Sequence, residues 1–315
     1  MDFLQDRILA SIYGHLIGDA LGVPYEFISP KKLPEEINWR GHGTHNQPLG
    51  TWSDDGALAL CLLASLTEKA SFDPPDVCHR FVQWYERGYM AAGGVFFDIG
   101  STTRQAISRI KSGVPPLEAG PSSEDNNGNG SLMRILPLAL WSCSLPTEDA
   151  MALSHDGSRL THGHVRSQVC CAMYGLLVRH LLTGKDRSTA WDAAANLADE
   201  IYSNEARFGK PYQDELRRIM EFSNCQGSGY VVDCLCSAWD AVNDAEDFVD
   251  AVCRAVRFGN DTDTTAAVAG GLAGLAFGLD SIPAEWREQL RLEDEQRRLI
   301  QRFVDTVSES LSASD

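Results

Sequence analysis

The fold is decided by Asp261-Thr262-Asp263-Thr264-Thr265-Ala266-Ala267-Val268-Ala269-Gly270-Gly271, an acidic cluster that runs directly into small apolar residues. Gly274 and Gly278 continue the four-residue spacing that begins at Gly270. Small residues at this spacing let two helices approach closely, which predicts a buried central helix over 263–278. A membrane span is a poorer explanation, because the segment is short and the aspartates that precede it are costly in lipid.

A second acidic cluster, Ser53-Asp54-Asp55, stands more than two hundred residues earlier and also leads into an apolar run, over 58–63. Both clusters place carboxylates where a largely buried helix begins, and helix N-termini favour anions. Four carboxylates in one place need counter-charge, and hard divalent cations such as Mg²⁺, Mn²⁺ or Ca²⁺ suit Asp and hydroxyl oxygens. A pair of such cations would match the formal charge of the four aspartates.

Each cluster also has an alternative explanation when it is taken alone. Ser53 is a suitable helix N-cap, with acids in the first turn behind it. The second cluster fits the DxDxT pattern of haloacid-dehalogenase phosphatases, but that pattern follows a strand, whereas 248–258 has the periodicity of an amphipathic helix. An EF-hand loop is excluded because Ala266 and Leu272 stand where that loop needs Gly and Glu.

Composition predicts one globular domain over 1–315. The chain has 43% hydrophobic and 23% charged residues, and no linker-like tract divides it. Its formal net charge of −17 argues against binding to nucleic acid or to an anionic membrane, because such partners need clustered Lys and Arg. Any bound phosphate would have to be met by backbone amides, a few Arg side chains or a metal.

The cysteines and the first residues bear on the cellular compartment. The nine cysteines include no CxxC pair and lie in helical-looking sequence, which predicts reduced thiols in the core. The first residues show no basic region followed by an apolar stretch, so we expect no secretory signal. Together these features favour a cytoplasmic location.

Apolar residues at three- and four-residue spacing dominate the chain, while period-two alternation is rare. We therefore predict an all-α fold, a single compact multi-helix domain. Long irregular segments over 24–53 and 113–130 interrupt the pattern, and such loops in a helical domain are often functional. The helices are predicted over 5–22, 55–69, 74–90, 100–112, 131–142, 146–157, 161–184, 187–204, 211–223, 230–241, 245–257, 263–278 and 287–311.

Four segments outside the clusters offer side chains or amides to a binding cleft. Glu26 follows an apolar turn, from which it can point back into a cleft, and Asp98 suits either an N-cap or a substrate contact. The loop 126–131 presents backbone amides ahead of a helix, which fits a phosphate site and an exposed turn equally well. His162 is expected to line a pocket, because its spacing from His164 does not suit zinc.

Taken together and in order, these segments resemble the ADP-ribosylglycohydrolase family, which includes dinitrogenase reductase activating glycohydrolase and the ADP-ribosyl-acceptor hydrolases. The resemblance spans most of the chain. Relative to common family patterns, Ser53 replaces Thr and Asn260 replaces Gly, and neither change removes a ligand. The motifs that carry the resemblance are Gly18-Asp19-Ala20-Leu21-Gly22-Val23-Pro24-Tyr25-Glu26, Ser53-Asp54-Asp55, Asp98-Ile99-Gly100, Asn129-Gly130-Ser131-Leu132-Met133-Arg134, Thr161-His162 and Gly259-Asn260-Asp261-Thr262-Asp263-Thr264.

The resemblance implies an all-α domain with two divalent cations, Mg²⁺ or Mn²⁺. The metal ligands that it implies are Ser53, Asp54, Asp55, Asp261, Asp263 and Thr264. The catalytic acids that it implies are Glu26, Asp55 and Asp98. The substrate contacts that it implies are Asn129, Gly130, Ser131, Met133 and His162.

The function implied is metal-dependent hydrolysis of the bond between ADP-ribose and a modified protein side chain, above all arginine. The partner would be an ADP-ribosylated protein or a small molecule that contains ADP-ribose. Asp98 favours arginine, because a carboxylate suits a guanidinium leaving group. The alternatives are hydrolysis of ADP-ribosyl-serine or O-acetyl-ADP-ribose, and a catalytically silent ADP-ribose-binding or structural protein, since the family also includes a lens crystallin.

Overall fold

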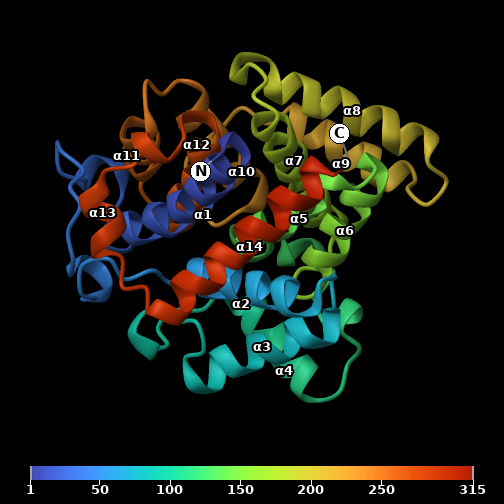
Figure 1. Ribbon diagram of the computed structural model, residues 1–315. Helices are drawn as coiled ribbons and strands as arrows, with labels where there is room; N and C mark the ends of the chain where they lie inside the picture. The colour runs from blue at the N-terminus through green and yellow to red at the C-terminus, as the bar shows by residue number, and fades with distance from the viewer. Residues whose placement is uncertain (1, 314–315) are drawn as a thin grey trace.

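The computed structural model describes residues 2–313 and is built from α-helices and short 3₁₀ turns (Figure 1). Within that range there is no β-strand, only two isolated β-bridges, so the prediction of an all-α, compact multi-helix domain is confirmed. The helices are α1 Phe3–Gly22, α2 Asp54–Lys69, α3 Pro74–Arg87, α4 Ser101–Lys111, α5 Leu136–Trp141, α6 Thr147–Arg159, α7 Val165–Leu182, α8 Ala190–Asn204, α9 Lys210–Met220, α10 Val231–Asn243, α11 Phe248–Arg257, α12 Thr262–Phe277, α13 Ala284–Gln289 and α14 Asp294–Ser312.

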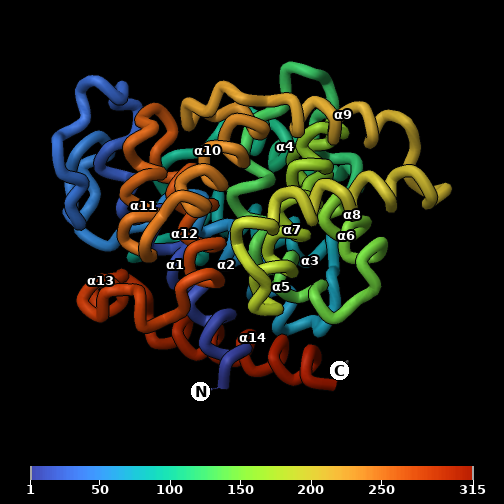
Figure 2. Tube along the Cα trace, turned by 90° about the horizontal axis from the view of Figure 1, so that it is seen from above, coloured from blue at the N-terminus to red at the C-terminus, as the bar shows by residue number. Residues whose placement is uncertain are grey.

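Helices α1 and α12 form a central pair, and they lie side by side in both views although they come from opposite ends of the sequence (Figure 1, Figure 2). Glycines allow the close approach. A Cβ atom on Gly14 would lie 2.3 Å from Gly270 O, and one on Gly18 would lie 1.9 Å from Ala266 O. The contact moves back along α12 as it moves forward along α1, so the two helices are antiparallel. The predicted buried central helix is confirmed.

The other helices surround this pair. α12 also packs against α7, α10 and α11, and α14 packs across α1 and α2. α3 covers α2, α4 covers α3, and α8 and α9 cover α7 on the outside (Figure 1). Because α1 contacts both α2 and α12, a single helix lies against the two elements that carry the acidic clusters.

Two of the predicted helices differ in ways that affect the binding segments. Residues 131–142 do not form one helix: a 3₁₀ turn covers Asn129–Arg134, and the short α5 follows with Pro137 in its first turn. The helix predicted over 161–184 begins at Val165, because the His164 side chain caps it by accepting from the backbone amide of Arg166. The phosphate loop and His162 are therefore turn residues rather than the openings of α-helices.

At the C-terminal end, the prediction of one helix over 287–311 is wrong. Glu293 and Gln296 form a capping box that starts α14 anew, so α13 and α14 are separate helices. The irregular segment 24–53 is confirmed, since it contains only 3₁₀ turns such as Gly43–His45.

Two further expectations concern the membrane and the cysteines. No helix in the described residues is long and apolar enough to cross a bilayer. All nine cysteines, which lie within residues 2–313, are free thiols, and seven of them are buried. The prediction of reduced thiols is confirmed.

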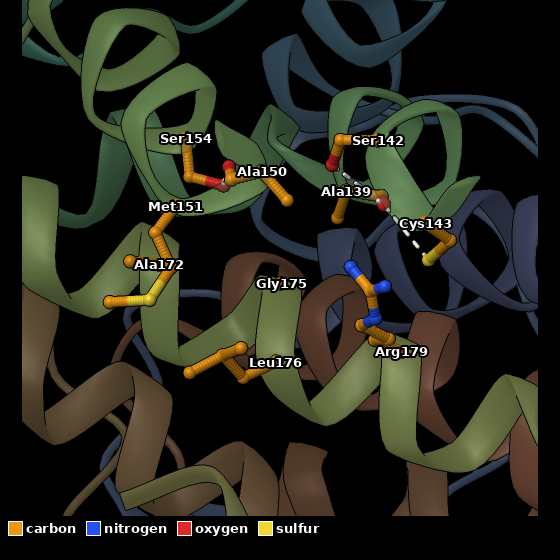
Figure 3. A pocket seen from close by; sticks show the side chains of 10 residues that line it. All are labelled: Ala139, Ser142, Cys143, Ala150, Met151, Ser154, Ala172, Gly175, Leu176 and Arg179. Atoms are coloured by element: carbon orange, nitrogen blue, oxygen red, sulfur yellow. Dashed lines mark hydrogen bonds between the residues drawn. The ribbon is translucent and has the colours of Figure 1, made fainter. Parts of the chain in front are cut away.

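A small crevice between α5, α6 and α7 lies away from the acidic clusters (Figure 3). Its volume of about 10 Å³ is roughly the space that one water molecule needs. Ser142 Oγ and Cys143 Sγ both donate to Ala139 O. On the opposite wall, Arg179 Nη1 donates to Leu145 O. These polar groups already have partners, so we attribute the crevice to packing.

Candidate functional site

The first acidic cluster lies at the N-terminus of α2. Ser53 is the N-cap, and its hydroxyl accepts from the backbone amide of Asp55, so the capping role is real. A residue of another helix also fixes the position of the cluster. The carboxylate of Asp19 on α1 accepts from the backbone amides of Ser53 and Gly56, each at 2.8 Å. Capping and site formation are therefore performed by the same residues.

The second cluster lies at the N-terminus of α12, where the end of α1 meets it. A Cβ atom on Gly22 would lie 2.4 Å from the Cα of Asp263, so only glycine leaves room for the cluster. Thr262 Oγ1 donates to Gly22 O at 2.8 Å. The final turns of α1 thus hold both clusters, the first through Asp19 and the second through Gly22.

The two clusters meet in one buried group. Thr264 Oγ1 donates to Asp55 Oδ2 across 3.3 Å, between residues that are 209 positions apart in the sequence. The other oxygen of that carboxylate, Asp55 Oδ1, is buried without a hydrogen-bond partner. Burial raises the pKa of Asp54, Asp55 and Asp263 well above the ordinary carboxyl range, and the neighbouring carboxylates raise it further.

This arrangement fits a hard divalent metal. Buried carboxylates that repel one another, together with an unpartnered oxygen and two hydroxyls, form the donor set that Mg²⁺ and Mn²⁺ prefer. The six residues predicted to hold metal gather here from α2 and α12: Ser53, Asp54, Asp55, Asp261, Asp263 and Thr264.

Glu26 and Asp98 extend the cluster toward the surface. One carboxylate oxygen from each of Glu26, Asp98 and Asp263, and one ring nitrogen of His45, all lie within 4.8 Å of one another. Burial raises the pKa of Glu26 to about 7; the hydrogen bond from His45 opposes the shift, and the charge of Asp98 adds to it. The structure therefore brings these two predicted acids to the candidate metal cluster.

The N-cap explanation for Asp98 is wrong. Gly100 is the N-cap of α4, and among residues 2–313 the Asp98 carboxylate accepts a hydrogen bond only from the adjacent amide of Ile99, at 2.8 Å. Asp98 has a φ of 56°, in the left-handed region that few non-glycine residues adopt. Its half-buried carboxylate lines the cleft, and a substrate contact stays a prediction for this residue.

A cleft of about 330 Å³ opens over the cluster. Its walls combine residues of the loop after α1, the segment before α4, the 3₁₀ turn over Asn129–Arg134 and the start of α12. Four predicted residues lie behind the lining: Ser53, Asp55, Ser131 and Asp263. The predicted residues that line the cleft are Glu26, Asp54, Asp98, Asn129, Gly130, Met133, His162, Asp261 and Thr264.

The predicted phosphate loop joins the cleft to the second cluster. Asn129 Nδ2 donates to Asp261 Oδ2 at 3.0 Å, so its side chain is occupied in this structure. Ser131 is fully buried, and its hydroxyl accepts from Ser158 Oγ at 3.0 Å. Beneath the loop, the buried Arg134 donates to Gly130 O at 2.7 Å. Its pKa is lowered to about 10 by burial, so it stays positively charged at neutral pH.

His162 lies at the back of the cleft against this loop. A Cβ atom on Gly130 would lie 2.9 Å from His162 Cε1, which places the ring directly beside the loop. Its Nδ1 is hydrogen-bonded to Thr161 Oγ1 at 2.8 Å, and burial lowers its pKa to about 3. A neutral imidazole that lines the cleft agrees with the prediction for this residue.

Sequence reasoning missed several residues that build the site. Asp19 lies within one of the family-like motifs but is assigned no role from the sequence, and His45 lies in the long irregular segment 24–53, in which only Glu26 and the first acidic cluster are singled out. Phe27 lines the cleft with 68% of its surface exposed and a φ of 61°. Its backbone amide donates to Asn260 O at 2.6 Å, and Asn260 also has a positive φ, of 59°. Segment 24–53 is rich in Pro, Gly and His, and this composition was the signal that could have directed attention to His45 and Phe27.

The fold and the site together define an all-α enzyme with a candidate carboxylate metal centre beside a polar cleft. A family model described as ADP-ribosylglycohydrolase matches residues 1–312. The chain belongs to the ADP-ribosylglycohydrolase family, whose members hydrolyse glycosidic linkages to ADP-ribose. The resemblance found in the sequence is thereby confirmed.

Similar proteins include two bacterial relatives with named substrates. The chain is 30% identical over 309 residues to ADP-ribosyl-[dinitrogen reductase] glycohydrolase of Rhodospirillum rubrum, covering 96% of each chain. It is also 30% identical to ADP-ribosylarginine hydrolase Tri1 of Pseudomonas putida (strain GB-1), covering 95% of this chain and 78% of that protein. A solved structure titled ADP-ribosylglycohydrolase-related protein complex has a TM-score of 0.80 and 32% identity, covering 98% of this chain and all of that one.

A more distant relative has a different name. ADP-ribosylhydrolase ARH3 of Danio rerio is 25% identical over 343 residues, covering 96% of this chain and 91% of that protein. The relatives with 30% identity include both the arginine hydrolase and the dinitrogen reductase glycohydrolase.

Proposed function

We propose that this chain is a metal-dependent hydrolase that removes ADP-ribose from modified arginine side chains of proteins. The observation that carries the proposal is the meeting of two acidic clusters, through Thr264 and Asp55, directly beneath a cleft lined by Glu26 and Asp98. A structural or purely binding protein has no need for this many buried carboxylates, which are costly when they are not neutralised. The named activity of the Pseudomonas putida relative agrees with arginine as the linkage.

Two divalent cations, Mg²⁺ or Mn²⁺, are the proposed cofactors. The residues that would hold them are Ser53, Asp54, Asp55, Asp261, Asp263 and Thr264. When bound, the cations would supply positive charge that orients ribose hydroxyls and lowers the pKa of water. Asp19 and Gly22 would hold the backbones of these ligands in place.

The remaining chemistry falls to the acids of the cleft. Cleavage of the bond at ribose C1 develops positive, oxocarbenium-like charge, which nearby carboxylates stabilise. Glu26 lines the cleft at the edge of the cluster, where it is suited to exchange a proton with the leaving group or with water. Asp98 and Asp55 complete the group of candidate catalytic acids, Asp98 from the leaving-group side and Asp55 from the metal side.

The ADP portion of the substrate would bind on the wall of the cleft away from Glu26 and Asp98. Gly130, Met133 and His162 line that wall, and the buried cation of Arg134 lies behind the loop. A diphosphate could be met there by backbone amides and this positive charge, despite the acidity of the chain as a whole. Asn129 would contact the substrate after exchanging its bond with Asp261.

A second candidate function is hydrolysis of ADP-ribosyl-serine or of O-acetyl-ADP-ribose. The acid at Asp98 favours arginine, because a carboxylate can pair with the guanidinium that leaves. A catalytically silent ADP-ribose-binding protein is less well supported, since none of the six proposed ligand residues is missing.

The test is a release assay on proteins that carry defined arginine- or serine-linked ADP-ribose, with Mg²⁺ or Mn²⁺. We expect release from arginine, with Asp54→Asn/Asp55→Asn as the inactive control. Preferential release from serine would replace the proposed linkage. Tight binding of ADP-ribose with no release from any substrate, with both metals supplied, would establish the silent alternative.

A further inference from the structure

His45 occupies a central place that neither the sequence motifs nor the proposed mechanism uses. Its Nε2 is hydrogen-bonded to Glu26 Oε2, and its side chain is largely buried. Its ring packs between two aromatic rings, with centroids 5.9 Å from Phe27 and 5.5 Å from Phe97. His45 is therefore in contact with both loops that carry the acids of the cleft, since Phe97 directly precedes Asp98.

The backbone around His45 is pressed firmly against the turn that carries Glu26. Thr44 Oγ1 donates to Glu26 O at 2.7 Å. A Cβ atom on Gly43, which has a φ of 71°, would lie 2.1 Å from Pro24 O. Only glycine permits this conformation and this approach. The 3₁₀ turn Gly43–His45 is thus held at a fixed place beside Glu26.

The segment that carries Asp98 is held by apolar side chains rather than by hydrogen bonds, and Ile99 is buried in the core. The only hydrogen bond of the Asp98 carboxylate in the described structure is the one from its neighbour Ile99. Phe96 anchors one side of the segment, with its ring 4.9 Å from that of Trp84 on α3. The ring of Phe97 reaches the other way, to His45. On the side of the cleft, His45 supports the part of this segment that precedes Asp98, through its contact with Phe97.

We propose that His45 is a positioning residue that sets the relation between Glu26 and Asp98. Its ring nitrogen orients the Glu26 carboxylate, and its ring face supports the backbone that presents Asp98. The inference rests on the proposed function, because it assigns a role in turnover to these two acids. It differs from a metal-binding role: His45 would act on the spacing of the acids and not on retention of the cations.

The two contacts of His45 can be removed one at a time. His45→Phe keeps a ring for Phe97 and Phe27 but cannot donate to Glu26, and His45→Gln can donate but lacks the ring. His45→Ala removes both contacts. The matched controls are His79→Phe, His79→Gln and His79→Ala, because His79 is an exposed histidine on α3.

We expect kcat on the arginine-linked substrate to fall about tenfold in His45→Phe and His45→Gln and about a hundredfold in His45→Ala, the last at the low end of the roughly 10²- to 10⁴-fold that general acid–base groups contribute. KM, and the affinity for Mn²⁺ measured by calorimetry, should change less than about threefold. The His79 variants should match wild type. In a Glu26→Gln background, His45→Ala should cost only about the tenfold that loss of the ring causes, because the carboxylate that the ring nitrogen orients is already removed.

Three outcomes would overturn the inference: a kcat within twofold of wild type in His45→Ala, a parallel loss of Mn²⁺ affinity and melting temperature, or full additivity with Glu26→Gln. Turnover by wild type together with any of these outcomes rejects the role of His45 alone. Absence of turnover by wild type rejects the proposed function instead. In that case a crystal structure of His45→Ala tests the positioning role. Positions of Glu26 and Asp98 unchanged from those in the wild type would reject that role.

Discussion

The two halves of the site are built differently. The carboxylates of α2 and α12 are buried at helix N-termini and are held by Asp19 and Gly22 of α1. Glu26 and Asp98 lie in loops, beside residues with positive φ, and are linked to each other through the side chain of His45. One half depends on the packing of helices, and the other depends on a few side-chain contacts.

Under the proposed function, the difference separates the residues that would bind metal from the acids that would act in turnover. Ligands at the ends of packed helices cannot move without disturbing the core, which suits a centre that must keep its geometry when the cations leave and return. Acids on loops can be repositioned at small energetic cost, which suits groups that meet different leaving groups. Variants in the two halves should therefore fail in different ways.

The largest expected effect is from Asp55→Asn in the helical half. Loss of this ligand, which contacts Thr264 and offers an unpartnered buried oxygen, should lower kcat/KM at least about a thousandfold, or about 4 kcal/mol. Calorimetry with Mn²⁺ should show a matching loss of affinity. Full Mn²⁺ affinity in this variant would mean that the proposed ligand set is wrong.

The next largest effect should come from Gly18→Ser, which tests the helix pair that supports the clusters. The new Cβ atom would lie 1.9 Å from Ala266 O, so α1 and α12 must separate. We expect the free energy of unfolding to fall by about 3 kcal/mol and the melting temperature to fall by roughly 4 to 5 °C.

Calorimetric melting of the metal-free protein is the measurement for this variant. Gly209→Ser is the matched control, because the only atom near its new Cβ is Pro211 Cδ at 3.7 Å. Equal melting temperatures for the two variants would contradict the proposed dependence on close helix packing.

A smaller and more selective effect is expected in the loop half. Asp98→Asn keeps the size of the side chain but removes its charge, so kcat on arginine-linked ADP-ribose should fall roughly 10- to 100-fold. Hydrolysis of a serine-linked substrate and affinity for Mn²⁺ should change much less. Equal losses on both substrates would show that Asp98 does not select the leaving group.

The smallest predicted effect is on stability as a function of pH. The pKa of Glu26 and that of Asp19 are both raised to about 7, chiefly by burial, from ordinary values of 4.5 and 3.8. Between those values the folded metal-free protein keeps protons that the unfolded chain releases, so stability falls as pH rises. In chelator, the melting temperature should drop by a few degrees between about pH 5.5 and pH 8.

Added metal should counter this drop, because it stabilises the ionised carboxylates. The gap in melting temperature between samples with Mg²⁺ and with chelator should therefore widen as pH rises. A metal-free melting temperature that climbs over the same range would contradict the assigned pKa shifts.

Much of the helical half could be predicted from the sequence. Acids and hydroxyls just before apolar runs identify the start of buried helices, and the glycine spacing along α12 indicates a close partner. The contact between Thr264 and Asp55 could not be derived from spacing, because it joins residues 209 positions apart. The family resemblance, and not local pattern, supplied that connection.

The loop half was harder to predict for a physical reason. Segment 24–53 has no periodicity, so nothing in it fixes which side chains point inward, and His45 was overlooked. Similarly, the stretch over 131–142 has apolar residues at helical spacing, but its first turns are 3₁₀. That change of geometry leaves the Ser131 hydroxyl bonded to Ser158, behind the cleft lining. Backbone conformation in such turns is set by tertiary contacts that no short pattern encodes.

The pairing of α1 with α12 also has a consequence for the order of events during synthesis. Ser11 Oγ donates to Gly271 O across 260 residues of sequence, so α1 must wait for α12, which is synthesised much later. At roughly 5–20 residues per second, that wait is on the order of tens of seconds. Until then α1 exposes the surface that later packs against α12, and the proposed metal ligands at the start of α2 lack those at the start of α12. The nascent chain should therefore gain catalytic competence only late in synthesis, and a chaperone that shields α1 in the interval would raise the yield of active enzyme.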